Sequence, residues 1–210
     1  MTLTNYLPAK HPLKQAADGI SLMVFFTLLW AVVAEIALSG RDYWLVGGLF
    51  LVILLVLLGY YAKFSAAARK FAPLSIAGGA HVKEEDPAKR KEGKRFLMVF
   101  ISEAVAILLI RNILAGTGLD DYFIPCFALI VGLHFFPLAR IFKRTFDYYV
   151  GTWTSLVAIA GIVLTWQRAW PPYLITALVA AGCALATSAN GLRIVMQGNK
   201  LNFNNSIAIH

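Results

Sequence analysis

Four ionisable side chains lie well inside apolar stretches of this sequence, where a charge must be compensated. They are Glu35, Glu103, Arg111 and His134. A charged residue at the centre of a membrane span costs about 2.5–3.5 kcal/mol on insertion scales, so such residues usually face the protein interior and find a partner. A carboxylate beside an imidazole can exchange a proton, because imidazole titrates near neutral pH. A carboxylate beside a guanidinium forms a charge-assisted pair with defined geometry.

Residue counts along the apolar stretches predict which of these side chains share a depth. At 1.5 Å per residue, Glu35 and Arg111 each lie about 22 Å from the side of the membrane where the first stretch begins. Glu103 lies about 10 Å and His134 about 12 Å from that side. The sequence therefore predicts an outer Glu35–Arg111 ion pair and an inner Glu103–His134 pair. Two interpretations stay open for each: a structural contact, or an outer gate together with an inner proton or substrate site.

Six apolar stretches carry these residues, each close to the roughly 20 residues that a helix needs to cross hydrocarbon. Hydrophobic residues make up 59% of the 210 residues and charged residues 14%, whereas soluble domains carry about 25% charged residues. Residues 51–58 are apolar all round, without the polar stripe of a soluble surface helix. We therefore expect an all-α polytopic membrane protein, a bundle of six transmembrane helices. The predicted spans are residues 20–38, 43–62, 96–115, 122–142, 149–166 and 173–196.

Lysine and arginine residues are distributed very unevenly between the two ends of these spans. Sixteen of them lie in the tails and in the connections after spans two and four, against only Arg41 and Arg168 on the opposite side. The positive-inside rule then places both termini in the cytoplasm. The chain divides into a cytoplasmic tail (1–19), spans one and two (20–62), a basic cytoplasmic loop (63–95), spans three to six (96–196) and a second cytoplasmic tail (197–210).

The basic loop at residues 63–95 carries nine lysine and arginine residues. Such a loop either binds anionic lipid or only fixes topology, and the second role is the one every multi-pass protein needs. Nucleic acid is not an expected partner, because residues 81–95 contain no aromatic side chains on which bases could stack. Asp86 followed by Pro87 resembles a helix N-cap and first helical residue, so the third helix is predicted to begin before the membrane.

Small residues recur at four-residue spacing in the sixth span, which allows helix backbones to approach closely. We expect this helix at the bundle centre or at a subunit contact in a homo-oligomer. The predicted packing residues are Ala177, Ala180, Ala181, Ala184 and Ser188.

Known catalytic motifs are missing from the sequence. It contains no P-loop, no G-x-G-x-x-G, no H-E-x-x-H, no C-x-x-C and no G-x-S-x-G. Cys126 and Cys183 lie at different depths and are expected to be small packing residues. No metal or other cofactor is predicted, and an intramembrane enzyme is the least favoured class.

One segment of the fourth span, residues 131–139, reads V-G-L-H-F-F-P-L-A. It resembles a G-L-H-F-x-P-L-A signature of small six-helix bacterial inner-membrane proteins of unknown function. The resemblance implies an inner-membrane location and no assigned activity. Two function classes therefore stay open: a small transporter or channel-like protein that uses Glu103 and His134, and a non-catalytic membrane subunit that binds a partner through the alanine-rich sixth helix.

Overall fold

The computed structural model of the protein describes residues 12–39, 41–42, 44–70, 87–142 and 144–207. Within these residues the chain is helical, without strands, and six of its helices are long and apolar enough to cross a membrane. The predicted all-α, six-helix membrane bundle is therefore confirmed. The elements are α1 (Pro12–Leu38), α2 (Leu45–Lys70), α3 (Pro87–Thr117), the short 3₁₀ helix η2 (Asp120–Tyr122), α4 (Phe123–Phe142), α5 (Thr145–Gln167) and α6 (Pro172–Ile207).

Several helices extend beyond the apolar spans that the sequence defines. α1 begins at Pro12, α3 at Pro87, and α6 continues to Ile207. Apolar composition marks only the part of a helix that lies in hydrocarbon, whereas backbone hydrogen bonds can carry the helix on into water. The N-cap prediction for Asp86 lies outside the described residues, as do residues 71–86, which include much of the loop predicted to meet anionic lipid.

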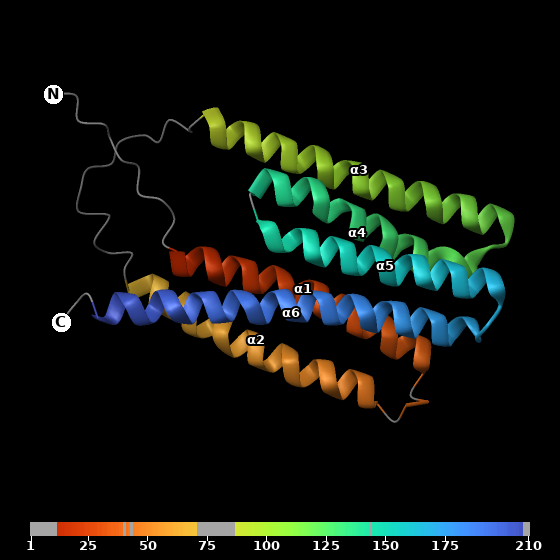
Figure 1. The fold of residues 1–210 in the computed structure, drawn as a ribbon, viewed down its shortest axis with the longest axis horizontal. Helices are drawn as coiled ribbons and strands as arrows, with labels where there is room; N and C mark the ends of the chain where they lie inside the picture. The colour runs from red at the N-terminus through yellow and green to blue at the C-terminus, as the bar shows by residue number, and fades with distance from the viewer. Residues whose placement is uncertain (1–11, 40, 43, 71–86, 143, 208–210) are drawn as a thin grey trace.

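The helices run alternately up and down, so that α1 begins and α6 ends at the same end of the bundle (Figure 1). We call this end the basic end, because it carries Arg140, Arg144 and Arg193, and the opposite end, with the α1–α2, α3–α4 and α5–α6 connections, the far end. α6 packs along α1 and also contacts α5, α2 and α4. α2 and α3 lie on opposite edges of the bundle, and α3 packs chiefly on α4 (Figure 1).

The α1–α6 interface is built from small residues and a few buried polar contacts. The hydroxyls of Thr27 and Thr187 are hydrogen-bonded at 2.9 Å, and the Asn190 side chain donates to the sulfur of Met23 at 3.3 Å. Most of the predicted packing residues of α6 are buried within the chain itself. Ala177, Ala180, Ala184 and Ser188 are buried, and Ala181 is half-buried.

Two glycines bring α4 and α5 into backbone contact. A Cβ atom added at Gly151 would lie 2.9 Å from the carbonyl oxygen of Gly132. One added at Gly132 would lie 2.8 Å from the backbone nitrogen of Ser155. Because no side chain fits at either position, α4 is held closely against α5, and it presents His134 to α3.

Candidate functional site

Glu103 of α3 and His134 of α4 meet between the two helices. The Nδ1 atom of His134 lies 3.0 Å from Oε2 of Glu103. The two side chains are only 11% and 13% exposed, respectively. The structure thus brings together the two residues that the depth count placed at one level. Their role as a proton or substrate site stays a prediction.

Both atoms of this contact carry lone pairs, so at least one of the two side chains must carry a proton. Nδ1 and Oε2 are at ion-pair distance, although their angle lies outside the range of a hydrogen bond. If neither atom were protonated, two acceptors would face each other at 3.0 Å and repel. The arrangement therefore fits a histidine that carries its proton on Nδ1, either neutral or as imidazolium, or else a protonated Glu103.

The pair lies between the apolar parts of α3 and α4. Glu103 lies seven residues after Phe96, where the apolar part of α3 begins, and so about 10 Å along the axis. On α4, Pro137 follows His134 by three residues and lies inside the helix. Proline has no N–H, so Pro137 cannot donate the hydrogen bond that the Leu133 carbonyl would otherwise accept. The backbone next to His134 is therefore more polar than in a regular helix.

The predicted outer pair of Glu35 and Arg111 does not form, and both residues have other partners. Nη1 of Arg111 lies 2.8 Å from Oδ1 of Asp120, which follows α3, and both side chains are more than half exposed. Its guanidinium also lies 5.2 Å from the ring centroid of Phe123. A depth count gives the level of a residue but not its neighbours: Glu35 is on α1, which packs on α2 and α6, whereas Arg111 is on α3, which packs on α4.

Glu35 instead caps the beginning of α2. Its Oε2 accepts a hydrogen bond of 2.8 Å from the backbone N–H of Gly47. Asp42 accepts two more, from the N–H groups of Trp44 at 3.2 Å and Val46 at 2.9 Å. The first N–H groups of a helix have no partner within it, and carboxylates satisfy them well. A Cβ at Gly47 would lie 2.8 Å from Oε2 of Glu35, so this capping contact depends on glycine.

Asp147 is a buried acidic residue that the sequence reasoning missed. It lies in the first turn of α5 and is 7% exposed. Asn190 of α6 is a polar neighbour of its carboxylate, and Arg144 and Arg193 are its positively charged neighbours. The predicted span begins two residues later, at Tyr149, and leaves Asp147 outside the apolar stretch. Its helical spacing from the buried residues Val150, Gly151 and Thr154 is the signal that could have found it.

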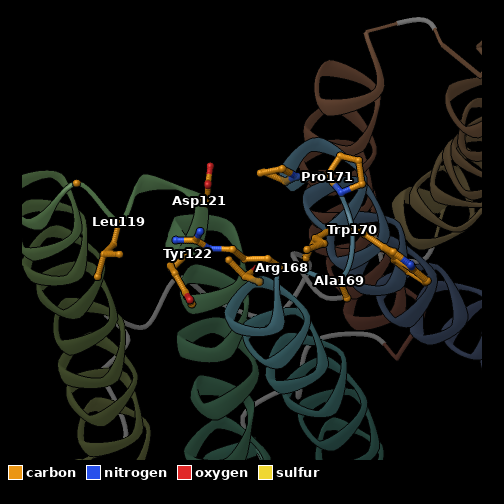
Figure 2. A pocket seen from close by; sticks show the side chains of 11 residues that line it. Leu119, Asp121, Tyr122, Arg168, Ala169, Trp170 and Pro171 are labelled. Carbon is orange, nitrogen blue, oxygen red and sulfur yellow. The ribbon is translucent and has the colours of Figure 1, made fainter.

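The far end of the bundle holds a hollow of about 520 Å³ between the α3–α4 and α5–α6 connections. Figure 2 shows Asp121 and Tyr122 on one side of it and Trp170 on the other, with the Arg168 side chain extending toward Asp121 and Tyr122 in this view. Neither Glu103 nor His134 lines this hollow. Gly118, which does, lies 15 residues after Glu103, or about 22 Å along a helix. The hollow and the Glu103–His134 pair are therefore separate features.

No protein-family model matches the chain, and searches of curated proteins and of solved structures found no match either. The resemblance of residues 131–139 to small inner-membrane proteins stays a prediction. The contact between Glu103 and His134 is thus the main guide to function.

Proposed function

We propose that this multi-pass membrane protein is a small transporter of the inner membrane, with both termini in the cytoplasm, in which Glu103 and His134 form the proton-binding site. The observation that carries the proposal is the 3.0 Å contact between two ionisable side chains that are almost enclosed by apolar helices. Ionisable residues within a span are costly and commonly mark ion and proton pathways.

Charge balance indicates how such a site would work. A glutamate paired with an imidazolium is neutral overall. When the extra proton leaves, the pair carries one negative charge, and an uncompensated charge in a low-dielectric interior is unfavourable. A cation entering the site would restore neutrality. The pair is thus suited to exchange a proton for a cation or a cationic solute.

The pair also lies at an interface where one helix, α3, can move relative to the other, α4. Only 6% of the apolar window of α3 is buried in the bundle. One face of the site is therefore supplied by a helix with few packing contacts to break, whereas the other belongs to α4, which is held against α5 by Gly132 and Gly151. In this proposal, α3 shifts relative to α4 when the proton is exchanged.

Reconstituted vesicles test the proposal. The protein is placed in liposomes that contain a pH-sensitive dye, a pH gradient is imposed, and Na⁺ or K⁺ is then added outside. We expect cation-dependent proton flux with the wild-type protein and its loss in Glu103→Gln and in His134→Ala. Ser102→Ala is the matched control, because Ser102 neighbours Glu103 but is exposed and bonds to the Val99 carbonyl of its own helix. If wild-type vesicles behave like empty vesicles with both cations, proton–cation exchange is excluded.

A second candidate function is a membrane subunit that binds a partner protein. The buried positions of Ala180 and Ala184 show that the alanine-rich face of α6 is used within the chain. A partner would therefore contact α3, whose apolar side chains Phe100, Val105 and Leu108 are exposed. Cysteines placed at these positions can be cross-linked in native membranes to separate the two candidates. A partner-binding subunit should give a defined adduct with another protein, whereas a transporter whose α3 faces lipid should give none.

A further inference from the structure

A long apolar groove runs along the surface between α5 and α6, which lie side by side (Figure 1). Its volume is about 520 Å³. Buried Val150 and Ala186 form its floor, and the exposed side chains of Tyr149, Trp153 and Leu185 form its rims. From Phe146 to Leu156 the groove follows ten residues of α5, or about 15 Å.

The walls of this groove are fixed in place. The indole N–H of Trp153 donates a hydrogen bond of 3.0 Å to the carbonyl of Gly182 on α6. A Cβ at Gly182 would lie 2.8 Å from a methyl group of Val157, so the two helices are in close contact beside the groove. A ligand would therefore meet a preformed surface.

Positive charge lies at one end of the groove, at the basic end of the bundle. The guanidinium carbon of Arg193 lies 4.3 Å from the ring centroid of Phe146, the first groove residue along α5. Arg144 is two residues before Phe146 and is exposed. The buried carboxylate of Asp147 is close to both arginines and offsets only one of their charges. Arg193, Arg144 and Asp147 together therefore carry one net positive charge at the end of the apolar groove.

We propose that the groove binds one anionic phospholipid, with an acyl chain along Tyr149, Trp153 and Leu185 and the phosphate beside Arg193 and Arg144. Basic pockets between transmembrane helices are known to receive anionic headgroups. A phospholipid without net charge would fill the groove but leave the net positive charge of Arg193, Arg144 and Asp147 uncompensated. This site is independent of the Glu103–His134 pair, which lies between α3 and α4.

Quenching of tryptophan fluorescence by brominated lipid tests this site. The protein is reconstituted in bilayers in which either phosphatidylglycerol or phosphatidylcholine carries bromine on its acyl chains, at equal mole fraction. The Trp153 signal is the difference between the wild type and Trp153→Phe. We expect brominated phosphatidylglycerol to occupy the groove about fivefold more readily, the ratio expected for one cation acting on one headgroup.

Two variants and a control make the outcome decisive. Arg193→Gln should abolish the preference, and Ala189→Leu, which fills the groove, should reduce the quenching by both lipids. Arg168→Gln removes an exposed arginine at the far end and should keep the wild-type preference. Circular dichroism checks that each variant is folded. Equal quenching by the two lipids in the wild type, an unchanged preference in Arg193→Gln, or a groove filled by a second protein copy would each overturn the proposal.

Discussion

α6 and α3 are both apolar enough to cross a membrane, yet the bundle holds them in opposite ways. Of the apolar window of α6, 56% is buried in the chain, against 6% for α3. α6 contacts four other helices, α1, α2, α4 and α5, and meets them with alanine, glycine and small hydroxyl side chains. α3 is attached to its neighbours by particular side-chain contacts: to α4 through Glu103 with His134 and Phe96 with Phe142, and to η2 through Arg111 with Asp120.

The difference shows that two kinds of interaction build this bundle. Lipid tails are as apolar as leucine, so burial of apolar surface alone does not draw helices together in a membrane. α6 is held by close shape complementarity with its neighbours, whereas α3 is held by polar and aromatic side-chain pairs. Volume changes should therefore act strongly on α6 and weakly on α3, whereas loss of a single polar contact should act on α3.

The largest effect is expected from overpacking the central helix. Ala180 is fully buried, so Ala180→Leu should destabilise the fold by about 3 kcal/mol. Ala104→Leu introduces the same side chain on the exposed side of α3 and should change the stability by less than about 0.5 kcal/mol. Equilibrium unfolding in mixed micelles measures both. Similar losses at the two positions would show that α3 is packed as closely as α6.

The next largest effect is expected at the Glu103–His134 pair. A double-mutant cycle with Glu103→Gln and His134→Ala should give a coupling energy of about 1–2 kcal/mol, as for interhelical polar contacts in model membrane peptides. Both side chains are almost enclosed, so the coupling should persist at high salt. The same unfolding assay measures the coupling, and a value near zero would remove this contact from the attachment of α3.

Replacing glycine by alanine should lower the stability when the change is made in α6 and raise it when the change is made in α3. At Gly182 of α6 a Cβ would lie 2.8 Å from Val157, so Gly182→Ala should cost about 1 kcal/mol. At Gly116 of α3 a Cβ would meet no atom within 4 Å. There Gly116→Ala should stabilise the helix by about 0.5 kcal/mol, because alanine loses less conformational freedom on folding. Thermal unfolding midpoints of the two variants give the signs, and equal signs would contradict the comparison.

The smallest effect is expected at the outer contact of α3. Arg111 and Asp120 are 52% and 60% exposed, so water and salt screen their attraction. A double-mutant cycle with Arg111→Gln and Asp120→Asn should give about 0.5 kcal/mol or less. The measurement is best made at low and high salt. A coupling as large as that of Glu103 and His134 would mean that this pair is shielded in the bilayer.

The sequence predicts the helices of this protein better than the contacts between them. Apolar length identifies each span, and a depth count brings Glu103 and His134 to one level, where the structure has them in contact. The same count fails for Glu35 and Arg111, because helices at equal depth need not be neighbours. Composition could not define helix ends either, and Asp147 was missed because its helix begins before the apolar run.

The α1–α2 hairpin has a consequence for biosynthesis. Glu35 is synthesised twelve residues before Gly47, from whose backbone N–H its carboxylate accepts a hydrogen bond. While the chain emerges from the ribosome, α1 has no partner for this carboxylate until the start of α2 has been synthesised. If α1 and α2 are inserted together as a hairpin, the Glu35 carboxylate enters the membrane with its hydrogen-bond partner already present. Delayed synthesis between Leu38 and Leu45 should therefore leave α1 poorly inserted.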